Sequence, residues 1–346
     1  MNKTEKRKEE HVNIVLNEDV SAHHNYWDDV RLIHNALPEI NKDEIDLSTK
    51  LLGKRMNAPV IIAGMTGGYS GAKKINENLA KTAEFFQIGM GVGSQRSALE
   101  NNKLRDTYGL VKNYDIPLRI ANIGASQIVR WKHKECIDNV LKIIEMIDAD
   151  AVAICLNFLQ EIIQPEGEAE AKGCYDRIKY LAEEIDIPVV VKESGAGITY
   201  DVAERLMGTS IAALDVGGLG GTSFAAIEHY RAKAAGDEVN ERCGKTFWDW
   251  GIPTPQSLIE VVEVAKGKKE VIATGGIRNG LDVAKAIALG ADAAGVAQAM
   301  LKPAIVGEKA VVMEMDTIFK ELEAAMFLVG ASNIKELHEA GVELWI

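Results

Sequence analysis

The sequence is poor in the features that mark secreted, membrane and metal-cluster proteins. Its 346 residues include only four cysteines, at positions 136, 155, 174 and 243, and no two of them form a CxxC pair. Neither a zinc site nor an iron–sulfur cluster is therefore indicated. The first residues, MNKTEKRKEEHVN, lack the apolar stretch of a signal peptide, and no apolar run reaches the ~18 residues that cross a bilayer. These absences predict a reduced, cytoplasmic protein without membrane association.

The chain also lacks an excess of positive charge. Its 39 Lys and Arg residues are outnumbered by 51 Asp and Glu residues, which gives a formal net charge of -12 at pH 7. Nucleic acid is not an expected partner, because a phosphate backbone requires clustered basic residues. An anionic ligand would have to meet a local basic site. Hydrophobic residues make up 47% of the chain, which is enough for a large core.

Short apolar runs bounded by turn residues recur eight times, and helical apolar spacing follows most of them. The predicted strands are 59–63, 88–92, 118–122, 151–156, 188–192, 212–216, 270–274 and 293–297. The predicted helices are 72–86, 134–147, 175–184, 202–207, 224–235, 255–265 and 281–289. Eight alternating strand–helix units predict a (β/α)8 TIM barrel. A doubly wound open sheet is the alternative, because strand count alone does not prove closure.

This pattern predicts one barrel domain with additions at both ends. Residues 1–58 form an N-terminal extension, 59–305 form the barrel, and 306–346 form C-terminal helices. The active face of such a barrel lies at the carboxyl ends of the strands. Glycine and polar residues follow each predicted strand. Any one such loop could be an ordinary turn, but eight together indicate a functional face.

The turn after the seventh predicted strand has the character of a phosphate site. Gly275 and Gly276 allow backbone N–H groups to approach an anion, and a predicted helix follows them. Arg278 could add a forked cationic donor. An ordinary turn with a solvated arginine would give the same letters. The barrel favours the phosphate interpretation, because the loops after strands seven and eight usually bind phosphate.

Lys192 ends the fifth predicted strand, where an ammonium is costly to bury without a partner. Its long side chain could instead extend to solvent. A cofactor that carries negative charge, such as a reduced flavin, would provide a counter-ion. We favour the interpretation in which Lys192 faces such a cofactor.

Six motifs follow the predicted strands or lie close to them. They are MTGG at 65–68, GVGSQR at 91–96, LNFLQE at 156–161 with QPEG at 164–167, GGTS at 220–223, DWGIPT at 249–254 and GGIR at 275–278. Together they resemble type 2 isopentenyl diphosphate isomerase, from about residue 7 to residue 301. The GGIR turn occurs in many FMN barrels, whereas the LNFLQE–QPEG and DWGIPT motifs are specific.

The resemblance implies an enzyme of isoprenoid biosynthesis that interconverts isopentenyl and dimethylallyl diphosphate, using reduced FMN, Mg²⁺ and NADPH as flavin reductant. It places the FMN phosphate on Gly275, Gly276, Ile277, Arg278, Ala297 and Gln298, and the flavin ring on Gly64, Met65, Thr66, Ser94, Asn122, Lys192 and Thr222. It places the substrate diphosphate on Arg7, Lys8, His11, Ser94, Gln95, Arg96 and Asn157. Glu161 would bind Mg²⁺, and Gln160 would face the alkene. The family also implies a homo-oligomer, a tetramer or octamer.

These assignments agree with elementary chemistry. A diphosphate is neutralised by Arg, Lys and an oxygen-bound Mg²⁺. Moving a double bond by one carbon requires one proton to be delivered and another removed. Because the Gln160 amide is a poor acid and base, our hypothesis is that the reduced flavin exchanges the proton, while Gln160 positions or relays it.

Two positions depart from the family pattern, and one segment depends on the resemblance alone. Cys155 stands where relatives usually have histidine, and Phe224 stands where they often have tryptophan. A cysteine supplies no cationic contact to a diphosphate, and phenylalanine loses an N–H donor. The mixed charges of residues 7–11 would otherwise be expected to be solvated and disordered.

Two alternatives belong to other functional classes. An FMN-dependent 2-hydroxyacid oxidase would share the GGIR turn, but it needs a histidine base after strand six, where residues 217–223 contain none. His229 lies within a predicted helix and is expected to be structural. The other alternative is a non-catalytic barrel that binds flavin or diphosphate. The presence of Gln160, Glu161 and Lys192 argues against it, whereas Cys155 keeps it open.

Overall fold

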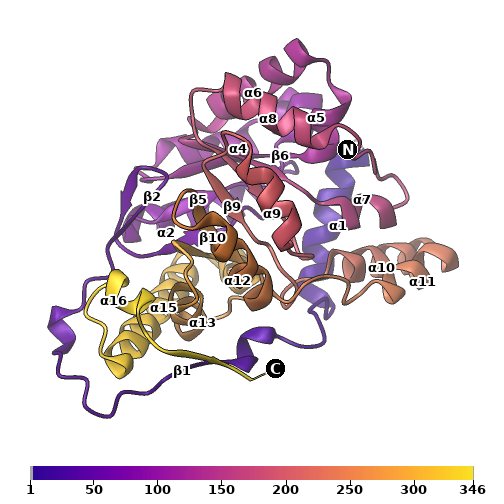
Figure 1. Ribbon diagram of the computed structural model, residues 1–346. Helices are drawn as coiled ribbons and strands as arrows, with labels where there is room; N and C mark the ends of the chain where they lie inside the picture. Colours follow the sequence, from indigo (N-terminus) through magenta and orange to yellow (C-terminus); the bar gives the residue numbers. More distant parts are fainter. Residues whose placement is uncertain (1–2, 346) are drawn as a thin grey trace.

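Eight parallel strands close into a barrel at the centre of the molecule (Figure 1). The computed structural model describes residues 3–345. Around the barrel the strands follow the order β10-β11-β4-β5-β6-β7-β8-β9. Their bounds are β4 Val60–Ile62, β5 Gly89–Gly91, β6 Arg119–Gly124, β7 Ala151–Cys155, β8 Val189–Lys192, β9 Ala213–Asp215, β10 Glu270–Thr274 and β11 Ala293–Val296. All eight predicted strands are confirmed, and closure rules out the open sheet.

Alternate strand residues face two different cores, because successive side chains of a strand point to opposite sides. In β4, Ile61 belongs to an inner cluster, whereas Val60 and Ile62 pack into the larger outer one. Leu51 and Met56 also join the inner cluster. They come from a hairpin of β2 (Thr49–Leu51) and β3 (Lys54–Met56), which therefore packs against the apolar barrel interior.

Helices follow the strands and surround the barrel. They are α2 Ala72–Phe86, α6 His133–Ile147, α8 Cys174–Glu184, α9 Tyr200–Met207, α10 Phe224–Ala235, α12 Thr254–Ala265, α13 Gly280–Ala288 and α14 Gln298–Val306. The seven predicted helices agree with the structure within two residues at either end. Helix α14, which follows the eighth strand, was not separately predicted.

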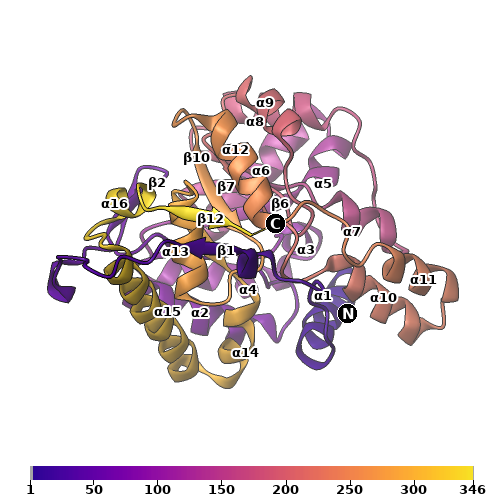
Figure 2. The ribbon, with the colours of Figure 1, turned by 60° about the horizontal axis from the view of Figure 1, so that its bottom comes forward.

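The additions at the two ends of the chain contain elements that the sequence patterns did not predict. Residues Lys3–Asn17 form helix α1. Strand β1 (Val30–Leu32) pairs antiparallel with β12 (Val342–Leu344), and Figure 2 shows the two strands side by side. Helices α15 (Glu308–Val329) and α16 (Ile334–His338) precede β12. None of the helices within residues 3–345 has the length and apolarity needed to cross a membrane.

Candidate functional site

A cavity of about 940 Å³ lies at the carboxyl ends of the barrel strands and is lined by the loops that follow them. Helix α1 contributes Arg7, Lys8 and His11 to its wall, so the charged N-terminal run is ordered and close to the barrel. The other predicted site residues that line the cavity are Gly64, Met65, Thr66, Ser94, Arg96, Asn122, Asn157, Gln160, Glu161, Lys192, Thr222, Gly275, Gly276, Ile277, Arg278, Ala297 and Gln298. Residues separated by almost 300 positions thus face one space.

Gln95 is the predicted contact that the structure does not bring to the cavity. Its side chain is fully buried, and its Nε2 donates to the Ile143 carbonyl oxygen at 2.9 Å. Its Oε1 accepts from the Asn122 N–H at 3.0 Å. We therefore correct its expected role: it supports the end of β6 and does not face a diphosphate.

The turn after β10 has the backbone shape that only glycine adopts easily. Gly275 and Gly276 have φ angles of 119° and 71°. A Cβ on Gly276 would lie 2.7 Å from the Gly220 carbonyl oxygen, so the neighbouring loop also leaves no room for a side chain. These two constraints explain the Gly-Gly pair and bring two glycine loops into contact at the cavity wall.

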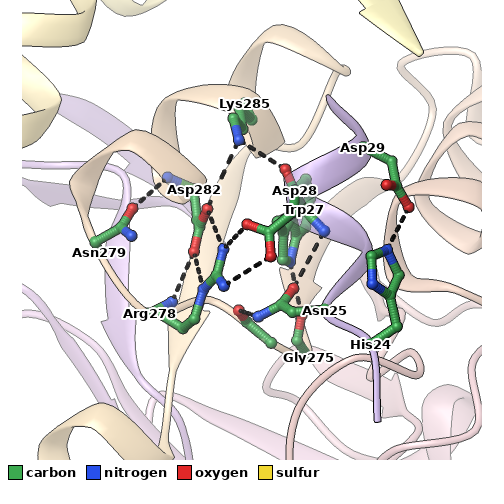
Figure 3. Close-up of polar contacts among 11 residues, drawn as sticks. His24, Asn25, Trp27, Asp28, Asp29, Gly275, Arg278, Asn279, Asp282 and Lys285 are labelled. Atoms are coloured by element: carbon green, nitrogen blue, oxygen red, sulfur yellow. Dashed lines mark hydrogen bonds and ion pairs between the residues drawn. The ribbon is translucent and has the colours of Figure 1, made fainter. Parts of the chain in front are cut away.

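The guanidinium of Arg278 is held by the protein itself (Figure 3). It donates to Asp28 Oδ1 at 2.6 Å and, through Nε, to Asp282 Oδ2 at 3.0 Å. These carboxylates raise the pKa of Arg278 above its usual value. A phosphate that contacts the Arg278 side chain would therefore have to share this guanidinium with the two carboxylates.

The sequence indicated that α13 would present its N-terminus to the cavity, but α14 does so instead. At the start of α13, Glu321 accepts the Gly280 N–H at 2.8 Å, and the Asn279 side chain caps Asp282. Helix α14 instead begins at the cavity, where Ala297 and Gln298 form part of the lining. An N-terminus whose first N–H groups face a cavity favours anions.

Lys192 lies at the floor of the cavity with 9% of its surface exposed. Its Nζ donates to the Glu193 carbonyl oxygen at 2.7 Å and lies 3.9 Å from Cys155 Sγ. Burial opposes its charge, but Cys155, Asp215 and Glu193 outweigh that effect and raise the pKa of Lys192. Asp215 is its register partner on β9. The cation therefore remains charged inside the cavity.

The lining fits FMN on the chemistry of its donors and acceptors. In the described part of the chain seven buried side-chain atoms have no hydrogen-bond partner, and two of them, Asn122 Oδ1 and Thr274 Oγ1, belong to residues that line the cavity. The phosphate end offers a glycine turn and a helix start, and Lys192 offers a cation. A flat ring with polar edges and one terminal phosphate matches this set.

Lys8 is the best-defined cation at the opposite end. It is half-buried, and its Nζ donates to the Ser94 carbonyl oxygen at 2.9 Å. Burial, reinforced by nearby Arg7 and Arg96, lowers the pKa of Lys8 to about 7. An arriving anion would restore its charge.

Arg96 is already engaged by acidic residues. Two N–H groups bind Glu168 at 2.9 and 2.8 Å, and Nε binds Glu100 at 2.6 Å. Arg130 pairs with the same Glu168. A diphosphate that contacts Arg96 would therefore replace, or share the cation with, these carboxylates.

His11 belongs to a buried ionic cluster that joins α1 to α10. Its Nε2 lies 2.9 Å from Glu228 Oε1, and Glu228 also accepts from Arg231 at 2.7 Å. Burial lowers the pKa of His11, so the neutral ring donates its Nε2–H to Glu228. Arg231 extends the cluster to Glu10 and Glu166 at 3.0 and 2.6 Å. Sequence patterns did not indicate Glu228 or Arg231, although their i,i+3 spacing on a predicted helix permits such a pair.

The LNFLQE run places its three polar side chains together at the start of α7 (Phe158–Ile163). Asn157 Nδ2 lies 3.1 Å from both Gln160 Oε1 and Glu161 Oε1. Glu161 Oε2 accepts from Gln164 at 2.7 Å and from the Glu168 N–H at 2.8 Å. The carboxylate is 5% exposed and lines the cavity.

Among residues 3–345 no cluster of three or more Asp, Glu, His and Cys side chains could hold a metal ion. Glu161 could nevertheless bind Mg²⁺, because that ion commonly takes one or two carboxylates and completes its shell with water and substrate phosphates. The oxygen set of Glu161 and Asn157 suits this arrangement.

Glu193 is a further ionisable residue that sequence reasoning missed. It lines the cavity, and its Oε2 accepts the N–H groups of Ser194 and Ala196 at 2.6 and 2.5 Å. Burial raises the pKa of Glu193 to about 7. Its position directly after Lys192 was the available signal. Burial also raises the pKa of three thiols, which keeps them protonated at neutral pH: that of Cys136 and Cys174 rises to about 11, and that of Cys155 rises above its usual value.

Solved structures with the same fold include several of mandelate oxidase. One, with benzoyl-formic acid, superposes with a TM-score of 0.67 at 17% identity and covers 99% of this chain and 97% of that one. A variant with a monooxide FMN adduct gives a TM-score of 0.66 at 18% identity, covering 93% and 90%. At such low identity, the similarity shows the fold alone.

Sequence comparison is more specific. The model of the FMN-dependent dehydrogenase family matches residues 15–156 and 157–344. An isopentenyl-diphosphate delta-isomerase from Thermoplasma volcanium is 48% identical over 97% of this chain and 95% of its own length. One from Methanosarcina mazei is 47% identical, covering 99% and 92%. The chain therefore belongs to the FMN-dependent dehydrogenase family, in the group that it shares with the isopentenyl-diphosphate delta-isomerases.

Proposed function

We propose that this protein is an isopentenyl-diphosphate delta-isomerase that interconverts isopentenyl and dimethylallyl diphosphate through protonation and deprotonation, with reduced FMN and Mg²⁺. One observation carries the proposal. A single cavity combines the lining expected for a flavin with a cationic end formed by α1 and the loop after β5, next to the polar side chains of the loop after β7. A diphosphate requires the cationic end. The relatives named above carry the same activity in their names.

At the cationic end, Arg7 and Lys8 would neutralise the diphosphate from α1. Arg96 would do so from the loop after β5. Because α1 also contributes Val12, Val15 and Leu16 to the lining, it would cover the prenyl chain and exclude water. Excluding water protects a cationic transition state from side reactions.

Glu161 would bind Mg²⁺ together with substrate oxygens. Three donors fix its carboxylate, two of them on Oε2 and one on Oε1. A carboxylate offers about four lone-pair positions, so at least one remains for the ion. The ion would offset charge on the diphosphate that the protein cations leave unpaired.

Gln160 would orient the alkene rather than act as an acid. Its Oε1 accepts from Asn157, which leaves the amide NH₂ for the cavity. Reduced FMN, when bound, would supply an electron-rich ring able to exchange a proton and stabilise positive charge. Lys192, fixed at the cavity floor by the Glu193 carbonyl, would supply a positive counter-charge for the reduced flavin.

Several finer features accompany this proposal. NADPH would reduce the flavin, the protein would function in the cytoplasm, and copies of the chain would assemble into a homotetramer or homo-octamer. Each rests on the resemblance to the isomerase family. The division into an extension at 1–58, a barrel at 59–305 and a C-terminal part at 306–346 belongs to the same proposal.

An oxidase function is a poorer fit to the cavity. Of the histidines in residues 3–345, His11 of α1 alone lines the cavity, and its ring is paired with Glu228 of α10. The loop after β9 offers glycine, threonine and serine instead of a histidine base. Incubation with 2-hydroxyacids should therefore leave the bound flavin oxidised.

The decisive experiment incubates the full chain anaerobically with FMN, Mg²⁺, NADPH and isopentenyl diphosphate, and measures dimethylallyl diphosphate. We expect product from the parent protein. Gln160→Asn should slow turnover while FMN stays bound, because the amide retreats from the alkene. Glu170→Gln, which removes an exposed carboxylate from the loop after α7, is the matched control and should retain activity. No product despite bound, reduced flavin would refute the proposal.

A further inference from the structure

Residues 25–28, in the segment after α1, pack against the Gly275–Gly276 turn, here called the phosphate turn, and bind its carbonyl oxygens (Figure 3). Trp27 donates its indole Nε1–H to the Gly275 carbonyl oxygen at 2.8 Å. Asn25 donates from Nδ2 to the Gly276 carbonyl oxygen, also at 2.8 Å. Two consecutive peptide groups of the turn are therefore held by side chains about 250 residues away in the sequence.

These two hydrogen bonds also fix the direction of the N–H groups that follow the two carbonyls. Each carbonyl shares a plane with the next N–H, and in a trans peptide the two groups point in opposite directions. No cis peptide is present in the described chain. Because the carbonyls of Gly275 and Gly276 are directed toward Trp27 and Asn25, the N–H groups of Gly276 and Ile277 are directed the opposite way, and both of these residues line the cavity. Within residues 3–345, neither N–H has a protein acceptor.

The orientation of both donors is itself fixed. Asn25 Oδ1 accepts the Trp27 backbone N–H at 3.1 Å, which leaves its NH₂ group for Gly276. The Trp27 ring is completely buried, and its carbonyl accepts from Lys285 Nζ at 2.6 Å. Asn25 cannot flip its amide without losing the contact with the Trp27 N–H, and the Trp27 ring is held by the packing around it.

Ionic contacts hold the segment in place beside the turn. Asp28 pairs with Arg278 through two oxygens, at 2.6 and 3.2 Å, and Asp282 fixes the same guanidinium. The hydrogen bond from Arg278 lowers the pKa of Asp28. The arginine of the GGIR motif thus fastens the N-terminal segment to the barrel.

We propose that Asn25 and Trp27 are positioning residues for the FMN phosphate: they orient the Gly275 and Gly276 peptide groups so that the turn presents its N–H donors to the cavity before the cofactor arrives. The proposal rests on the FMN site of the proposed function. It assigns a cofactor-related role to two side chains outside every motif identified in the sequence, and one of them, Asn25, also lines the cavity.

The test compares FMN with riboflavin, which carries the same ring without the phosphate. Dissociation constants for both ligands are measured by flavin fluorescence with the flavin-free full chain and with Trp27→Phe and Asn25→Ala. A lost orienting hydrogen bond should weaken FMN binding roughly three- to tenfold in each variant. Riboflavin affinity should stay within about twofold of the parent value, because the phosphate site does not contact it.

Trp248→Phe is the matched control. It removes an indole N–H that donates at 2.8 Å to the Ser21 carbonyl oxygen of the same extension, away from the phosphate turn. It should leave the ratio of the two affinities unchanged. Thermal unfolding of each flavin-free protein tells lost packing from lost orientation, and Asn25→Ala removes little volume.

The proposal is overturned if FMN binding is unchanged in both variants, or if riboflavin affinity falls by the same factor as FMN affinity. Because isomerase activity is not measured, a parent protein that binds FMN without turning over substrate would refute only the proposed function. A parent protein that binds neither flavin would overturn both.

Discussion

Lys8 should make the affinity for diphosphate depend on pH above neutrality. Its pKa of about 7 in the free protein means that the ammonium is protonated below pH 7 and mostly neutral above it. A bound diphosphate attracts the charged form and should raise this pKa well above 8. Substrate binding at pH 8 must then be accompanied by proton uptake.

The size of the effect follows from the two protonation states. At pH 8 a group with a pKa near 7 is about one-tenth protonated, so binding should take up about 0.9 proton per site. Where the free protein has lost this proton and the complex has kept it, the dissociation constant should rise by close to tenfold per pH unit. The useful window is about pH 7.5 to 9, since the last ionisation of a phosphate ester lies near 6 and is then complete.

Calorimetry with oxidised holoprotein measures both quantities, because without reduced flavin the substrate binds but should not turn over. Titrations with isopentenyl diphosphate and Mg²⁺, in buffers of different ionisation enthalpy, give the proton count directly. Lys8→Arg is the matched variant: its guanidinium stays protonated throughout, so its affinity should be nearly independent of pH in this window. Lys8→Met should bind weakly at every pH.

Two results would refute this reasoning. One is a wild-type affinity that does not change between pH 7.5 and 9. The other is a Lys8→Arg variant with the full wild-type pH dependence. The second result would point to Glu193. Burial raises the pKa of this carboxyl to about 7, and its ionisation would repel the same anion.

Three further substitutions and one labelling experiment test other parts of the site. Glu161→Gln should lower turnover by about a hundredfold or more, since metal-ion stabilisation is worth several kcal/mol, while FMN stays bound; full activity at limiting Mg²⁺ would exclude the metal role. Lys192→Met should make the flavin harder to reduce, seen as a more negative potential in a redox titration, because the cavity loses a cation that would stabilise the reduced ring; an unchanged potential would contradict that role. Arg231→Met should cost about 3 to 5 kcal/mol in a denaturant titration, because the buried Glu228 loses its cationic partner and keeps only the His11 ring, and a loss below about 1 kcal/mol would argue against the buried cluster. Alkylation of the folded protein at pH 7.5, followed by mass spectrometry, should modify Cys243 alone, because burial raises the pKa of the other three thiols; rapid labelling of any of these would show local opening.

The barrel could be predicted because its signals are local. Each strand is a short apolar run, and each following helix has its own periodic face, as in residues 270–288. The terminal additions could not be predicted in the same way. Helix α1 is mostly charged and buries none of its residues completely, so its sequence resembles that of a solvated terminus. Strands β1 and β12 have three residues each, and their pairing depends on tertiary contact rather than on local preference.

In the candidate site, too, the positions that follow from local patterns could be predicted, and those that depend on distant contacts could not. Residues at or directly after strand ends, such as Lys192 and Asn157, were expected at the cavity because barrel topology places every carboxyl strand end on one face. Gln95 belongs to such a loop, yet its side chain turns inward to support β6. Arg278 was assigned to a phosphate, but its partners Asp28 and Asp282 are recognisable only once the N-terminal segment is placed beside the turn. A motif gives the position of a side chain along a loop, whereas its direction depends on contacts that are distant in the sequence.

The pairing of β1 with β12 bears on the order of events during biosynthesis. Residues 30–32 and 342–344 are joined edge to edge, and Trp345 donates its N–H to the Asp29 carbonyl oxygen at 2.8 Å. A nascent chain leaving the ribosome can complete all eight barrel strands before this pairing is available. Until residues 342–344 have emerged, the segment that carries Asn25 and Trp27 has no outer strand to secure it. Cofactor loading should therefore be a late step, and a nascent chain halted before residue 342 should retain FMN poorly even though its barrel is complete.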